Sequence, residues 1–221
     1  MTRNQVLSTL RERMWRKRLF GSGSEMVDED LPAGYKRLLD LSTSGNLRYV
    51  SNIFLTGADT LAFTYMSESG NLLGSFNATN ANDNYSYYPS TNALAKYARY
   101  NGQMGGSSSA PYTEYSIVIS PNGITGSRNP SEFNPTEFVC STPFCVFATS
   151  DDGSVISSAT IYGNIEISGS QRISLIPCEN PSGVLGWYDT LHGEFVEPKG
   201  EGVPSTSGYD TSHLVPKGDD N

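Results

Sequence analysis

The residues best suited to chemistry in this chain are aromatic rings beside amide and carboxylate groups. Asn82 and Asp83 lie just ahead of Tyr85, Tyr87 and Tyr88. Tyrosine rings can stack on the faces of sugar rings, while amide and carboxylate groups bond to sugar hydroxyls. The cluster therefore predicts a glycan-binding site. Its alternation also fits tyrosines that pack inside a β-sandwich, and the sequence leaves both interpretations open.

The sequence patterns for catalysis and for metal binding are weaker than the pattern for glycan binding. The acidic turn at 151–154 could lend carboxylates to calcium, but that ion takes about six to eight oxygens from several segments, so we interpret it as a turn. A glycosidase needs two carboxylates facing each other across a cleft, and Glu166 is isolated in its run. His192 and His213 have no nucleophile motif beside them. We expect no catalytic residue, no metal and no cofactor.

The cysteines give no framework of disulfides. Cys140, Cys145 and Cys178 are three in number and cannot all pair within one chain. These cysteines and the two histidines do not have the spacing of ordinary zinc ligands. We expect three free, partly buried thiols in a protein made in a reducing cytosol.

The elements that must position these residues are short. Twenty-two glycines and 12 prolines, with frequent Ser, Thr and Asn, divide the 221 residues into brief segments. After residue 25 few windows keep a helical period, whereas β-branched and aromatic residues alternate in short runs. The pattern predicts an all-β domain in which two antiparallel sheets pack face to face.

The expected strands follow from these alternating runs. The turn residues Pro121-Asn122-Gly123 end one of them, and Gly163-Asn164 divides another into more than one strand. The Gly- and Ser-rich segment 101–110 is predicted to be a loop. The runs lie near residues 47–55, 60–66, 72–76, 85–88, 112–120, 136–140, 144–149, 154–167 and 171–176.

The segment 173–196 carries the most structural information. Two apolar runs flank Glu179–Gly183, whose Asn-Pro and Ser-Gly pairs favour a turn. A second turn is expected at Asp189–Gly193, after which Phe195 begins another strand. The segment is predicted to be an antiparallel meander that closes a sheet.

The N-terminal residues have a different period. Thr2 and Gln5 have the spacing of a capping box, and Gly21 suits a helix end, so we expect a helix over residues 3–20. Its apolar stripe is too narrow to be stable uncovered. Copies of itself, another protein or its own sandwich could cover it. The residues expected to dock or self-assemble are Val6, Leu7, Leu10, Met14, Trp15, Arg11, Arg16 and Arg18.

Charge and composition divide the chain further. The first 20 residues hold six basic residues and one acid, a net charge of +5, whereas the remaining nine basic and 22 acidic residues give −13. An acidic body disfavours nucleic acid and anionic membranes as partners. We expect no signal peptide at the N-terminus, and no run approaches the roughly 20 apolar residues of a membrane span. We expect a helix and Gly/Ser linker over 1–24, a β domain over 25–202 and an extended or disordered tail over 203–221.

Three phrases resemble a known family when taken in order. The chain has LPAGY at Leu31–Tyr35, PFCVFATSDDGS at Pro143–Ser154 and LIPCENPSGVLGWYDTLHGEF at Leu175–Phe195. These are similar to the opening, a middle strand and the closing motif of the concanavalin-like, or laminin-G-like, jelly-roll domains of phage and phage-derived proteins of gut bacteria. The resemblance covers Leu31 to Gly202, and the stretch from Thr56 to Asn134 departs from it.

The resemblance implies a two-sheet jelly-roll sandwich in a phage setting. With the basic N-terminal helix, it leads us to expect a non-enzymatic virion protein, namely a head fibre, a tail fibre or a capsid decoration protein. Such a protein is made in the host cytoplasm and exposed on the particle. Its expected partners are further copies in a dimer or trimer, other virion proteins and glycans. A stand-alone carbohydrate-binding module and a glycoside hydrolase are the alternatives.

Overall fold

The computed structural model describes residues 26–44, 46–67, 72–77, 83–89, 95–108, 113–126, 131–150 and 158–217. All regular elements in these ranges are β-strands, as expected for an all-β chain. The described chain divides into two compact units, one made of residues 26–33 and 211–217 and the other of Gly34–Asp210. The expected helix over 3–20, with all of its docking residues, lies outside the described residues.

The smaller unit is built from two short strands. β1 (Met26–Asp28) pairs antiparallel with β19 (Leu214–Pro216), with Val27 opposite Val215. The Asp28 carboxylate accepts a bond from the Asp30 amide, which shapes the turn after β1. The start of the expected β domain and the expected tail thus each contribute one strand to this unit.

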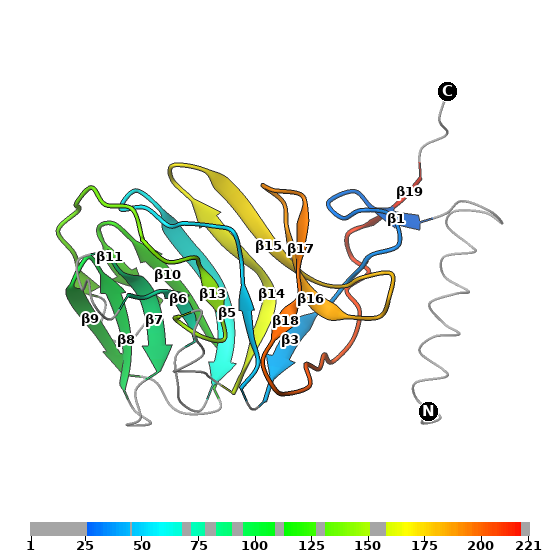
Figure 1. Ribbon diagram of the computed structural model, residues 1–221, viewed down its shortest axis with the longest axis horizontal. Coiled ribbons are helices and arrows are strands. Elements are labelled where there is room, and N and C mark those ends of the chain that lie inside the picture. The colour runs from blue at the N-terminus through cyan, green and yellow to red at the C-terminus, as the bar shows by residue number, and fades with distance from the viewer. Residues whose placement is uncertain are drawn as a thin grey trace. The chain divides into compact units, whose positions relative to one another are not determined.

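Two antiparallel sheets form the sandwich-like arrangement of the larger unit (Figure 1). One sheet has ten strands in the order β12-β11-β10-β5-β14-β15-β16-β17, with β2 beside β15 and β3 beside β14. Its strands are β2 (Lys36–Arg37), β3 (Asp40–Thr43), β5 (Thr60–Ser67), β10 (Tyr115–Ser120), β11 (Gly123–Thr125), β12 (Ser131–Glu132), β14 (Ala159–Ser168), β15 (Arg172–Glu179), β16 (Leu185–Asp189) and β17 (Glu194–Val196).

The second sheet has seven strands in the order β18-β4-β13-β6-β7-β8-β9. The isolated bridges Leu38–Tyr209 and Ser42–Ser205 show that part of the expected tail belongs to the larger unit. The strands are β4 (Arg48–Val50), β6 (Leu73–Ser75), β7 (Tyr85–Pro89), β8 (Ala95–Tyr100), β9 (Gln103–Ser108), β13 (Cys145–Val146) and β18 (Pro198–Lys199).

Alternation along the strands builds the core. In β5 the side chains of Leu61, Phe63 and Tyr65 are buried while their neighbours are partly exposed, which is the period-two pattern of a strand with one face on a core. β14 was expected to be more than one strand because of Gly163-Asn164. It is instead one strand whose register shifts between Tyr162 and Glu166, so the glycine marks a bulge.

Two expectations in the middle of the chain are wrong. The segment predicted to be a loop at 101–110 contains β9, because Asn101-Gly102 forms a two-residue hairpin turn with positive φ at both residues. The strand expected over 136–140 is an extended segment that makes a single bridge, between Val139 and Thr56. By contrast, the turn at Pro121-Asn122 is confirmed, since Ser120 pairs with Gly123 across it.

The closing meander is confirmed. β15 pairs with β16 and β16 with β17, with turns at the expected residues. The Asn180 carboxamide oxygen accepts bonds from the amides of Ser182 and Val184, which holds the first turn. The Asp189 carboxylate accepts bonds from the amides of Leu191 and His192 in the second.

Candidate functional site

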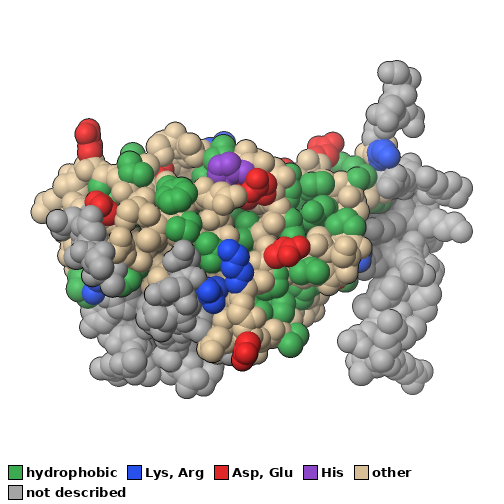
Figure 2. Space-filling view, viewed as in Figure 1, with side chains coloured by type: hydrophobic (Ala, Val, Ile, Leu, Met, Phe, Trp, Pro, Cys, Tyr) green, Lys and Arg blue, Asp and Glu red, His purple; other side chains and the backbone are tan. Residues whose placement is uncertain are grey.

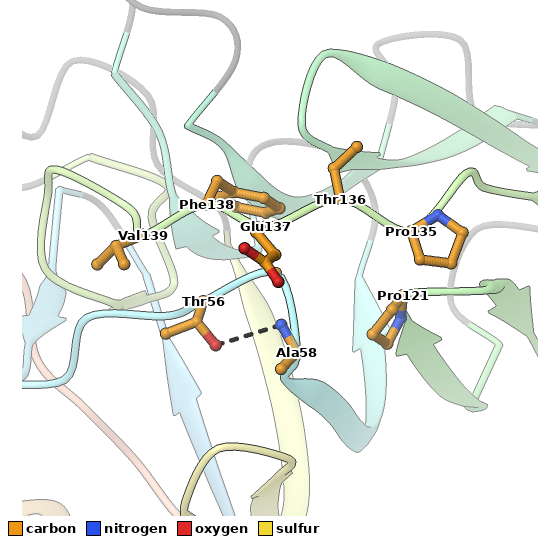
Figure 3. Close-up of a pocket in the computed structure, with 9 residues that line it drawn as sticks. Thr56, Ala58, Pro121, Pro135, Thr136, Glu137, Phe138 and Val139 are labelled. Carbon is orange, nitrogen blue, oxygen red and sulfur yellow. Dashed lines mark hydrogen bonds between the residues drawn. The ribbon is translucent and has the colours of Figure 1, made fainter.

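An open groove of about 780 Å³ is the candidate functional site (Figure 3). Its volume lies in the range typical of ligand sites, roughly 300–1,000 Å³. Three segments distant in sequence form it: the turn before β5, the turn between β10 and β11, and the extended segment before β13. The lining residues are Thr56, Gly57, Ala58, Pro121, Pro135, Thr136, Glu137, Phe138 and Val139.

Tyr100, at the end of β8, bonds to two of these segments, the turn before β5 and the extended segment before β13. Its phenol lies 2.6 Å from the carbonyl oxygen of Gly57 and 3.0 Å from that of Thr136, and the Thr136 amide bonds to the phenolic oxygen at 3.1 Å. The Tyr100 ring also meets Phe138 edge to face, with centroids 5.1 Å apart. A buried phenol with this many partners fixes the spacing of the walls.

Tyr85, on β7, and Asp59, directly before β5, hold the same region. The Tyr85 phenol bonds to the carbonyl oxygens of Asp59, at 2.6 Å, and Ile119, at 2.7 Å. The buried Asp59 carboxylate accepts bonds from the amide and hydroxyl of Thr56 and from those of Ser170. Burial raises the pKa of the Tyr85 phenol, the Asp59 charge adds to the rise, and the phenol remains a donor.

The approach of the walls requires a glycine at position 57. The Gly57 amide donates to the Phe138 carbonyl oxygen at 2.8 Å. A Cβ at this position would lie 2.0 Å from the Thr136 carbonyl oxygen and 2.9 Å from the Phe138 ring. Only a residue without a side chain permits this contact.

The groove offers apolar surface and one charge. Phe138 is half-buried and Val139 is exposed, while Glu137 is the single ionisable side chain among the nine lining residues. In Figure 3 the Glu137 carboxylate points toward the side formed by Thr56 and Ala58. Figure 2 shows hydrophobic side chains exposed at several places on the visible face, with acidic side chains spread among them. The arrangement is suited to binding an apolar group next to a cation.

Two of the three tyrosines expected to bind glycans lie in the core. Tyr85 and Tyr87 are 0 % exposed, and the Tyr87 phenol shares a 2.8 Å bond with that of Tyr65. These two rings therefore cannot stack on a sugar, and the packing interpretation holds for them. Asp83 is partly exposed. Asn82 and the side chain of Tyr88 lie outside the described residues, so glycan binding there stays a prediction.

Other candidates from the sequence are accounted for by local contacts. Glu166 accepts bonds from Asn164 and Ser174 on its own sheet. His192 pairs through Nδ1 with the Asp189 carboxylate at 2.7 Å, inside the closing turn. The three cysteines are buried and form no disulfide, and burial raises the pKa of Cys140 to about 12. The turn at 151–154 lies outside the described residues.

The described part of the chain contains no group of three His, Cys, Asp or Glu residues placed to hold a metal ion. Among the same residues, no helix has the length and apolarity of a membrane span. The chain matches no family model, and no curated protein has a significantly similar sequence.

Sequence reasoning missed the groove. Its lining is drawn from residues 56–58, 121 and 135–139, and no motif or spacing links three segments that only the fold brings together. The one local signal was Gly57 in the Thr56–Asp59 turn, because a glycine before a strand can mark a close backbone approach. The partners of that approach cannot be read from a single sequence.

Proposed function

We propose that this chain is a non-enzymatic structural protein of a bacteriophage particle, a head fibre, tail fibre or decoration protein that displays a lectin-like β-sandwich. The sandwich is a concanavalin-like jelly roll, and glycans of the host or of mucus are its external contact. The basic N-terminal segment assembles copies or anchors them in the particle.

One observation carries the proposal: the opening and closing phrases of the resemblance meet in space. β2, which directly follows the opening phrase, pairs with β15 of the closing phrase, with Arg37 opposite Cys178. The Tyr35 ring packs against Tyr188 and Phe195, with centroids 5.9 and 5.6 Å apart. Two phrases that close one sheet together are a more specific sign than either phrase alone.

The strand order gives further support for a jelly roll. Consecutive segments cross repeatedly between the sheets: β3 lies in the ten-stranded sheet, β4 in the seven-stranded one, β5 in the first again and β6 to β9 in the second. The chain then returns for β10 to β12, crosses for β13 and returns for β14. This winding between two antiparallel sheets is typical of jelly rolls.

The test is the presence of the chain in particles. A lysing culture that carries its coding sequence is fractionated on a density gradient, and the chain is quantified by mass spectrometry relative to the major capsid protein. Co-banding at a fixed ratio, with antibody against residues 34–210 labelling intact particles, supports the proposal. A chain that stays in the soluble fraction contradicts it.

A stand-alone carbohydrate-binding module is the second candidate, and the groove favours it. The half-buried Phe138 ring lies beside the hydroxyl-bearing Thr56 and Thr136 and the Glu137 carboxylate, a combination that can contact a sugar ring and its hydroxyls. Calorimetry against purified bacterial surface polysaccharide and mucin glycans tests this function. Saturable binding that Glu137→Gln weakens supports it, and its absence contradicts it.

A further inference from the structure

Two segments that line the groove each carry an exposed, large apolar side chain close to it in sequence. Thr56 bridges to Val139, and the Cys140 amide donates to the Leu55 carbonyl oxygen at 2.7 Å. Leu55 and Cys140 are buried, so the alternation of the two segments turns Phe54 and Val139 outward. Phe54 is 51 % and Val139 62 % exposed. Large apolar side chains left in solvent on paired segments beside an apolar groove are candidates for an interaction surface.

The charge of the groove is complementary to one segment of the chain. Glu137 is its ionisable lining residue, and residues 21–221 carry a net charge of −13. Residues 1–20 carry +5, and within them Trp15 has Arg13 and Arg16 as close neighbours. One chain therefore contains an apolar groove with a single carboxylate and a basic segment with an aromatic residue.

We propose that the groove and Phe54 receive residues 1–20 of a second copy of this chain, with Trp15 against the apolar lining and Arg16 beside Glu137. This inference rests on the proposed function, since it names the surface through which the N-terminal segment assembles copies.

The side-chain chemistry of the groove and of residues 1–20 explains why Trp15 is the proposed anchor. Tryptophan and arginine contribute most often to the energetic centre of protein interfaces. The rings of Pro121, Pro135 and Phe138 offer flat apolar surface to an indole. An arginine next to the indole can pair with a carboxylate through its planar guanidinium. In the proposed contact, the apolar side chains of Val6, Leu7 and Leu10 cover Phe54 and Val139.

Fluorescence of the full chain tests the contact directly. The chain has two tryptophans, and Trp187 is 0 % exposed in the core, so acrylamide quenching reports on Trp15. Quenching and mass by light scattering are measured over a dilution series. We expect an oligomer with a shielded Trp15 at high concentration, and dissociation with increased quenching on dilution.

Two groove variants and two matched controls make the test specific. Glu137→Lys and Val139→Ser are expected to raise the dissociation constant about 30-fold or more, as the loss of a central interface contact does. Glu114→Lys and Val118→Ser make the same chemical changes at exposed positions outside the groove and are expected to leave the dissociation constant unchanged. Glu137→Lys combined with Arg16→Glu restores the oligomer. Near-ultraviolet circular dichroism of Trp187 verifies that each variant is folded.

Each remaining outcome contradicts the inference in a distinguishable way. A wild-type oligomer that neither groove variant weakens overturns the groove as the docking surface but leaves self-assembly intact. A monomer with an exposed Trp15 overturns self-assembly as well. A monomer whose Trp15 is shielded at every concentration overturns the role of a second copy. Loss of polysaccharide binding in Glu137→Lys, with its mass unchanged, assigns the groove to glycans.

Discussion

The phenol of Tyr100 donates a 2.6 Å hydrogen bond to the carbonyl oxygen of Gly57, and this bond joins the seven-stranded sheet to one wall of the groove. The same phenol reaches Thr136 on the opposite wall. The two walls lie 79 residues apart in sequence, at Gly57 and Thr136. Their separation is set by Tyr100 on β8, a strand that belongs to neither wall. The shape of the groove therefore depends on a residue that does not line it.

Removing this phenol is expected to loosen the groove. Tyr100→Phe keeps the ring and its contact with Phe138 but leaves the bonds to Gly57 and Thr136 unmade. Buried carbonyl groups without a donor cost about 1–3 kcal/mol. We expect the free energy of unfolding in urea to fall by about that amount. Tyr188→Phe, at a half-exposed ring, is the control and should change it by less than about 0.5 kcal/mol. Equal losses in both variants would contradict this role.

Adding one methyl group between the walls is expected to have a larger effect. In Gly57→Ala the new Cβ would lie 2.0 Å from the Thr136 carbonyl oxygen, so the extended segment must move. Overpacking of this kind costs about 1–3 kcal/mol or more. Thermal unfolding should show a lower midpoint, and Ala58→Ser, at the exposed neighbour, should not. An unchanged midpoint in Gly57→Ala would show that the wall moves freely.

Local signals in the sequence were sufficient for the closing meander. Asn-Pro and Ser-Gly pairs between two apolar runs specify a turn through backbone restrictions that do not depend on the rest of the fold. Asn101-Gly102 is an equally strong hairpin signal, and it was masked by the high Gly and Ser content that follows. At this position the turn chemistry of Asn-Gly outweighs the loop-like composition of the residues after it.

The roles of the tyrosines could not be predicted from local signals. Tyr85 and Tyr87 are two residues apart and so point to the same face of β7, but the period does not say which face is inward. Tertiary packing decides which face of β7 is buried, because the buried face is the one that packs against the other sheet. The buried phenols of Tyr85 and Tyr100 bond to backbone carbonyls of segments distant in sequence, and a sequence cannot reveal these partners.

The buried thiols should be inert in the folded chain. Burial raises the pKa of Cys140 to about 12, and Cys145 and Cys178 are buried as well. The thiolate is the reactive form, so its scarcity and the lack of access both slow reaction. With a disulfide reagent at pH 8 we expect no rapid titration of the native chain and three rapidly titrated thiols in denaturant. A rapidly reacting thiol in the native chain would contradict the burial.

The surface cluster around Glu179 makes stability depend on acid. Lys36 Nζ lies 2.6 Å from one carboxylate oxygen of Glu179, and the Tyr209 phenol donates to the other at 2.6 Å. Lys36 also lies over the Tyr209 ring, 5.2 Å from its centroid. The bond from Lys36, followed by that from Tyr209, lowers the pKa of Glu179 below its ordinary value of 4.5.

A lowered pKa gives this contribution a definite sign. Above pH 4.5 the carboxylate is ionised in both states, so the folded chain gains the full stabilisation, which for a pair with an exposed lysine is at most about 1 kcal/mol. As the pH falls from 4.5 through the lowered pKa, the unfolded chain takes up the proton first and the stabilisation is lost. The free energy of unfolding of Glu179→Gln should therefore be lower than that of wild type at pH 7 and converge with it in acid. Lys36→Met removes the main cause of the shift and should abolish most of this pH dependence. A difference between wild type and Glu179→Gln that stays constant from pH 7 to pH 3 would show that the effect is steric rather than electrostatic.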